Sequence, residues 1–137
     1  MMQRRLFLTL AAAAGSANAA PYVVDGAARV RAGALRGTLL DLTLAGTRLI
    51  AVGERGHVLL SDDEGKTWRQ ARSVPTRTTL TCVHATEPNT LWAAGHGGMI
   101  LRSTDAGETW SIVTGNADGP DVLLCIRVEA DGRGLAM

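Results

Sequence analysis

The sequence predicts an all-β protein made of repeated four-stranded antiparallel sheets, and three observations lead to this prediction. An octet occurs twice, as SDDEGKTW from Ser61 and as STDAGETW from Ser103, 42 positions later. The segments that end in these octets, RLIAVGERGHVLLSDDEGKTW and TLWAAGHGGMILRSTDAGETW, align without a gap. Each copy also holds short apolar runs separated by turn residues. Because four strands in roughly 40–45 residues are typical of a β-propeller blade, we expect about two to two and a half blades.

The predicted strands come in the same order in both copies. Their ranges are 39–44, 48–52, 57–60 and a strand from Lys66 in the first copy, and 80–83, 90–94, 99–102 and a strand from Glu108 in the second. A Gly-x-x-Gly turn joins the second strand to the third in each copy. Turns that repeat in sequence favour propeller blades over a sandwich, whose turns need not repeat.

A third copy begins near the end of the sequence, with a predicted strand at 122–128 and a turn at 131–134. We divide the chain into a lead-in segment at 20–34 and a propeller region at 35–137, with repeats near 37–78, 79–120 and 121–137. The last residue falls inside the next expected strand, so we expect the sequence to be a fragment. Unpaired strand edges promote association, and self-association through such edges is therefore expected.

Five octet positions are identical in both copies: Ser61, Asp63, Gly65, Thr67 and Trp68 in the first, and Ser103, Asp105, Gly107, Thr109 and Trp110 in the second. The aspartate can accept hydrogen bonds from its own loop, the glycine permits a positive φ, and the tryptophan can pack between sheets. Calcium loops need more oxygen ligands, and the carboxylates of a glycosidase must converge on one bond. We therefore expect a structural role for all ten residues.

The first residues predict an export signal at 1–19. Arg4 and Arg5 precede an apolar run, and small residues up to Ala19 match a signal-peptidase site, so cleavage is expected after Ala19. The twin arginines are compatible with Tat export as well as with Sec export. The mature chain is then expected in the periplasm, without direct insertion into a membrane.

Composition and charge exclude other classes of protein. The chain of 137 residues is 46% hydrophobic and 20% charged, as globular domains are. Its net charge is +1, and loss of Arg4 and Arg5 from 14 basic residues leaves 12 against 13 acidic ones, a net charge of −1. Nucleic-acid binding needs a strong basic patch, so no nucleic-acid partner is expected.

Few other residues offer reactive side chains. Cys82 and Cys125 lie in similar apolar contexts, LTCVHA and LLCIRV. In an oxidising compartment they either form a disulfide or pack separately as small apolar residues. His57, His84 and His96 are not spaced as metal ligands on one face. We therefore expect no metal site, no cofactor and no catalytic residue.

The pattern Ser-x-Asp-x-Gly-x-Thr-Trp resembles the Asp-box of BNR-repeat propellers, in which the box is a folding element on the rim away from the ligand sites. Such boxes also occur in sialidases, so a sialidase-like, glycosidase-like or glycan-binding propeller is the alternative function. Sialidases also carry an Arg-Ile-Pro motif, which this sequence lacks, and a tyrosine nucleophile. The only tyrosine, Tyr22, lies beside the predicted cleavage site.

The longer phrases GxxGxVLLSDDEGKTW and GxGGxILRSTDAGETW are similar to exported propellers related to the photosystem II stability and assembly factor, over residues 35–137. The resemblance implies a seven-bladed, non-enzymatic propeller with an arginine-rich face. In phototrophs such a face binds the newly made reaction-centre protein in the thylakoid lumen, so the expected partner is a protein, including a membrane-protein complex under assembly. Five arginines either belong to such a face or are solvated charges: Arg29, Arg31, Arg36, Arg48 and Arg55.

Overall fold

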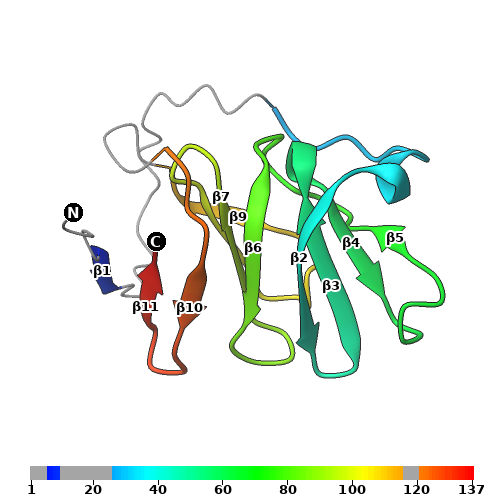
Figure 1. The fold of residues 1–137 in the computed structure, drawn as a ribbon. Helices are drawn as coiled ribbons and strands as arrows, with labels where there is room; N and C mark the ends of the chain where they lie inside the picture. The colour runs from blue at the N-terminus through cyan, green and yellow to red at the C-terminus, as the bar shows by residue number, and fades with distance from the viewer. Residues whose placement is uncertain (1–5, 10–25, 116–120) are drawn as a thin grey trace.

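The computed structural model describes residues 6–9, 26–115 and 121–137, and two four-stranded antiparallel sheets form most of it (Figure 1). The first blade consists of β2 (Leu39–Ala45), β3 (Arg48–Gly53), β4 (Val58–Ser61) and β5 (Arg69–Gln70). The second blade consists of β6 (Leu80–Ala85), β7 (Leu91–Gly95), β8 (Ile100–Ser103) and β9 (Ser111–Thr114). Strands that are neighbours in sequence are neighbours in each sheet. The predicted all-β propeller fold is confirmed.

A smaller third sheet has the strand order β1 (Leu6–Thr9), β11 (Arg133–Ala136) and β10 (Ile126–Val128), all antiparallel. The strand predicted at 122–128 is therefore too long, and β11 takes up part of the turn predicted at 131–134. The cause is local: the backbone N–H groups of Leu124 and Cys125 both donate to the carbonyl of Met137, at 2.5 and 2.9 Å. Two residues opposite one make a bulge, which interrupts the ladder before β10.

The fourth strand of each blade begins later than the sequence suggests. Lys66 and Glu108 were expected to start these strands, but their backbone N–H groups donate to the carbonyls of Asp63 and Asp105, at 3.3 and 3.4 Å. These bonds keep both residues in the octet turn. Strands β5 and β9 therefore begin only after the tryptophan that ends each octet.

Apolar residues between the two blades form the largest core cluster. They alternate with residues on the opposite sheet faces, as expected of strands with a period of two. The main contributors are Ile50, Val58 and Leu60 from the first blade and Leu91, Leu101 and Trp110 from the second, all buried. Each blade is thus stabilised mainly by the sheet beside it.

One strand from each sheet lies beside the next, in the order β10, β6, β2 (Figure 1). An Asp41 carboxylate oxygen accepts a hydrogen bond from the backbone N–H of Val83 at 2.9 Å and so ties β2 to β6. Ser73, in the segment that leaves the first blade, forms a parallel bridge with Thr109 of the second octet. Backbone bonds of this kind fix the relative positions of the blades.

Two short 3-10 helices are the only helices in the described part of the chain: η1 (Ala34–Arg36) and η2 (Glu54–Gly56). No helix among the described residues is long and apolar enough to cross a membrane. Most of the predicted signal segment, including Ala19, lies outside the described residues, and Leu6–Thr9 within it pairs with β11. Cleavage and export stay predictions.

Candidate functional site

The two octet loops are locked by the same set of hydrogen bonds. In the first, Asp63 Oδ1 accepts from the Thr67 backbone N–H at 2.8 Å and Asp63 Oδ2 accepts from Thr67 Oγ1 at 2.6 Å. Ser61 Oγ donates to Asp63 Oδ1 at 2.9 Å and accepts from the Gly65 N–H at 2.8 Å. Gly65 has φ +85°, which strains other residues. Trp68 Nε1 donates to the Gly65 carbonyl at 3.0 Å and completes the loop.

The second octet repeats these contacts closely. Asp105 accepts from the N–H and the hydroxyl of Thr109 at 2.9 and 2.6 Å, and Ser103 donates to Asp105 at 2.8 Å. Hydrogen bonds from Thr67 hold the pKa of Asp63 below its usual range. Burial acts to raise the pKa of Asp105, but hydrogen bonds from Thr109 and Ser103 outweigh it and the pKa is lowered. Both carboxylates thus stay ionised and engaged in their own loops, and they belong to different sheets.

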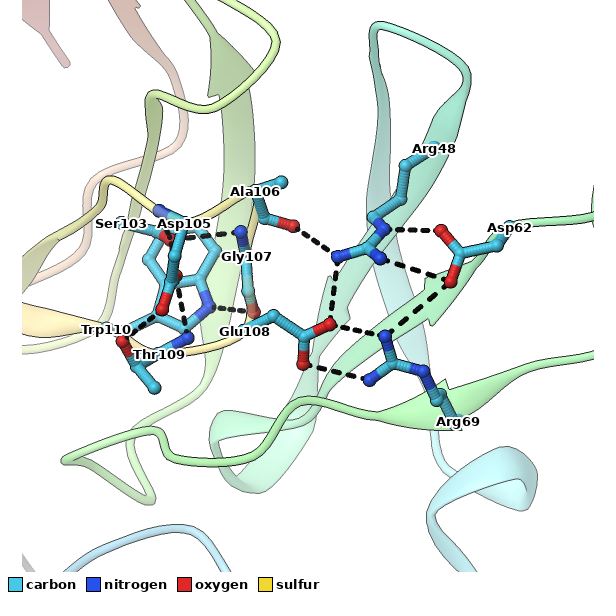
Figure 2. A network of polar contacts seen from close by, with 10 residues as sticks. All are labelled: Arg48, Asp62, Arg69, Ser103, Asp105, Ala106, Gly107, Glu108, Thr109 and Trp110. Carbon is cyan, nitrogen blue, oxygen red and sulfur yellow. Dashed lines mark hydrogen bonds and ion pairs between the residues drawn. The ribbon is translucent and has the colours of Figure 1, made fainter.

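An ion-pair network joins the second octet to the first blade (Figure 2). Arg48 donates to Asp62 at 2.5 and 3.1 Å and to Glu108 at 3.0 Å. Arg69 donates to the other Glu108 oxygen at 2.9 Å, and this hydrogen-bonded pair is the main reason that the pKa of Glu108 is lowered. Arg48 also donates to the Ala106 carbonyl at 3.1 Å. The network is a contact between blades, so Arg48 is not available as part of a binding face.

A second group of arginines lines an open pocket of about 300 Å³. Its lining residues are Arg29 and Arg31 from the lead-in, Arg55 from the β3–β4 turn, Arg77 from the segment between the blades, and His57 just before β4. We call these five residues the arginine pocket. Residues 26–34 of the lead-in run along the edge of the blades opposite the β2–β3 turn (Figure 1). The pocket therefore lies away from the octet loops.

Backbone contacts hold the lead-in in place beside the first blade. Gln70 Nε2 donates to the Arg29 carbonyl at 2.9 Å, and Gln70 Oε1 accepts from the Arg31 N–H at 3.0 Å. Arg77 Nε donates to the Ala27 carbonyl at 3.3 Å. In the described part of the chain, no carboxylate lies within ion-pair distance of any of the four pocket guanidinium groups. Within the described ranges, no ion pair competes with an anion for these groups.

Arg55 occupies an unfavourable backbone conformation, with φ +56°. The equivalent position in the second blade is Gly97, with φ +66°, which adopts this conformation without a penalty. A non-glycine residue in the left-handed region costs about 1 kcal/mol. Glu64 and Ala106 in the octet loops also have positive φ, at +60° and +56°, so this conformation alone does not mark a binding site.

Arg77 is a pocket residue that the sequence did not single out, and His57 was considered there only as a metal ligand. His57 is only 6% exposed, and its Nδ1 has no hydrogen-bond partner among the residues that the structure describes. Burial lowers its pKa, the negative charge of Glu54 opposes this, and Arg55 and Arg31 lower it further. The equivalent residue in the second blade is the buried Met99. A histidine where the repeat has an apolar residue was the signal that could have revealed it.

The remaining candidates lie elsewhere. His96 is exposed in its turn, whereas His84 lies within β6 with Nε2 3.2 Å from the Val128 carbonyl. Arg36 is exposed in η1. Cys82 and Cys125 are free thiols, and burial raises the pKa of Cys82 to about 11. No group of three potential metal ligands occurs within the described ranges.

The sequence and the fold can be compared with those of known proteins. No model of a protein family and no curated protein matches the sequence. The structure is similar to YCF48 bound to D1 peptide, with 24% identity, a TM-score of 0.58, and coverage of 66% of this chain and 31% of that chain. It is also similar to YCF48 from Cyanidioschyzon merolae, with 27% identity, a TM-score of 0.55, and coverage of 66% and 28%. The chain spans less than a third of either neighbour, and over that length its β-propeller fold resembles that of YCF48.

Proposed function

We propose that this chain is a non-catalytic propeller module that binds an acidic segment of a protein partner in the arginine pocket. The observation that carries the proposal is the convergence of Arg29, Arg31, Arg55 and Arg77 on one pocket without a carboxylate partner among the described residues. Guanidinium groups bind carboxylates through two parallel hydrogen bonds. An acidic peptide is the ligand class that such a pocket recognises.

The similarity to YCF48 bound to D1 peptide supports a peptide ligand, because that neighbour carries one. A role in assembling a membrane-protein complex, in the periplasm or in a thylakoid lumen, follows as part of the proposal. The pocket lining contains no carboxylate among the described residues. Glycoside hydrolysis generally relies on a pair of carboxyl groups, so this lining supports binding rather than hydrolysis.

Binding of a fluorescent hexaglutamate peptide, followed by fluorescence anisotropy, tests the proposal. We expect salt-dependent binding that weakens about tenfold, or 1.4 kcal/mol, in each of Arg55→Gly and Arg77→Ala. Arg55→Gly is a suitable variant because glycine adopts the positive φ of this position without strain. Arg36→Ala is the matched control, since Arg36 is exposed but does not line the pocket. Equal affinity in all three variants would refute the proposal.

A further inference from the structure

One face of the first blade is apolar and only partly covered: Ala51 and Leu59 are 3% and 1% exposed in a cluster with Ala34, whereas the β2 side of this face is open. Leu42 and Leu44 of β2 are 53% and 60% exposed, and Trp68 is only partly buried. A shallow hollow of about 430 Å³ lies on this side, lined by residues that include Leu42, Ala51 and Trp68. Contiguous exposed apolar surface of this kind marks an interaction site. We call this side of the blade, formed by Leu42, Leu44, Leu49, Ala51, Leu59 and Trp68, the open face.

The second blade shows what covers an equivalent surface. Four open-face residues have counterparts 42 positions later in the chain: Leu91 for Leu49, Ala93 for Ala51, Leu101 for Leu59 and Trp110 for Trp68. These counterparts are 0%, 0%, 0% and 6% exposed, because the first blade packs on them. Ala51 and Leu59 are also buried, so the difference between the two surfaces lies at Leu49 and Trp68, which are only partly buried. The open face therefore has the side chains of a surface that packs against a sheet.

The charged residues around the covered surface indicate what kind of sheet could pack on the open face. In the covered surface, Glu108 of the octet pairs with Arg48, which is the first residue of β3 and follows the β2–β3 turn. On the open face the octet has Lys66 at this position, exposed and without an ion-pair partner in the described part of the chain. The incoming sheet should therefore carry acidic residues where its first strand turns into its second.

The third sheet of this same chain has that property. The turn between β10 and β11 carries Glu129 and Asp131, both exposed, and Asp131 pairs only with the neighbouring Arg133 at 2.7 Å. One side of this sheet packs on the second blade through Ile126, Val128 and Ala136. Exposed apolar residues also lie in this last stretch of the chain, with Leu124 at 70% and Met137 at 56%. Both apolar surface and negative charge are thus present to meet the open face.

We propose that the open face of the first blade packs against the third sheet of a second copy of this chain, with Lys66 facing Glu129 and Asp131. The contact is head-to-tail, because each copy supplies a different surface. Such contacts generate a closed ring or an open chain of copies rather than a two-fold dimer. The stacking continues the interface already present between the first and second blades.

Sedimentation velocity of the full chain between about 1 and 100 µM tests the contact. We expect concentration-dependent association that Leu42→Glu reduces at least tenfold. Val113→Glu is the control, because Val113 is 38% exposed on β9 and lies outside the open face. A monomer over the whole range, or equal association of the two variants, would overturn the proposal. A monomer is also the result expected if the open face binds a blade of another polypeptide.

A charge reversal separates this contact from non-specific aggregation and does not depend on a core residue. Lys66→Glu should weaken association about tenfold, and addition of Glu129→Lys and Asp131→Lys in the same chain should restore it. All three side chains are exposed, so the variants should fold. Failure of the triple variant to regain association, with circular dichroism unchanged, would contradict the head-to-tail arrangement.

Discussion

The two edges of the blades differ in how closely their sequences repeat. At the octet loops, SDDEGKTW and STDAGETW share five of eight residues, and these residues form matching hydrogen bonds in both blades. At the β3–β4 and β7–β8 turns, the sequence Glu-Arg-Gly-His of the first blade aligns with His-Gly-Gly-Met of the second. The shared octet residues form the same loop in each blade. The turn residues differ between the blades, and in the first blade they contribute Arg55 and His57 to the arginine pocket. In a repeat protein, departures from the repeat are therefore the better guide to a binding site.

The largest expected effect comes from the octet tryptophans, which are identical in sequence but differ in burial. Trp110→Ala should lower the free energy of unfolding by about 3–5 kcal/mol, because the indole is 6% exposed between the blades. Trp68→Ala should lower the free energy of unfolding by roughly half as much, since Trp68 lies on the open face and is only partly buried. Urea unfolding at low protein concentration measures both. Equal losses would contradict the difference in packing.

The octet serines come next, and here the two blades should behave alike. Ser61 and Ser103 are each 1% exposed and each donate to the octet aspartate. Removing either hydroxyl leaves its hydrogen-bond partners unsatisfied. Ser61→Ala and Ser103→Ala should therefore each lower the free energy of unfolding by about 1–3 kcal/mol. Thr104→Ala, at an exposed octet position, should change stability by less than about 0.5 kcal/mol. A large difference between the two serine variants would show that the loops are not equivalent.

The ion-pair network should contribute less than the octet bonds. Glu108→Gln is expected to cost about 1 kcal/mol at low ionic strength, because the glutamate is partly buried and joins two arginines. The loss should shrink in about 1 M salt, where exposed charges are screened. Glu64→Gln, whose glutamate has no ion pair within the described residues, is the control. A salt-independent loss would argue against an electrostatic role.

The smallest effect concerns the protonation of His57. Burial lowers the pKa of His57 in the folded state. Near and below pH 6.5 the unfolded chain therefore binds more protons than the folded chain. The free energy of unfolding should fall as the pH drops below that value. His57→Met, which copies Met99 of the second blade, should remove this pH dependence. Urea unfolding from pH 5.5 to about 8 is the measurement. An unchanged pH profile in the variant would assign the effect to another group.

The blade strands and the locked loops could be predicted from the sequence because both depend on local, repeated patterns. Asp63 and its partner Thr67 are four residues apart, so the octet alone specifies their contact. The arginine pocket could not be predicted in this way. It brings Arg29 next to Arg77 only after the lead-in pairs with Gln70 of β5, a contact without a sequence signature.

The strand limits that were wrong have a similar explanation. The fourth strands start late because turn bonds of the octet hold Lys66 and Glu108. The bulge before β10 arises from pairing with Met137. Both effects depend on which backbone groups find partners, and apolar patterns do not report that.

The central claim is that the octets build the scaffold and that the divergent turn binds the ligand. It is tested most directly by replacing residues 54–57, Glu-Arg-Gly-His, with His-Gly-Gly-Met of the second blade. We predict an unfolding midpoint close to that of the parent chain, because the second blade shows that this turn supports the same strands, and hexaglutamate binding that is at least tenfold weaker. A chimera that folds and binds the peptide with unchanged affinity would contradict the account.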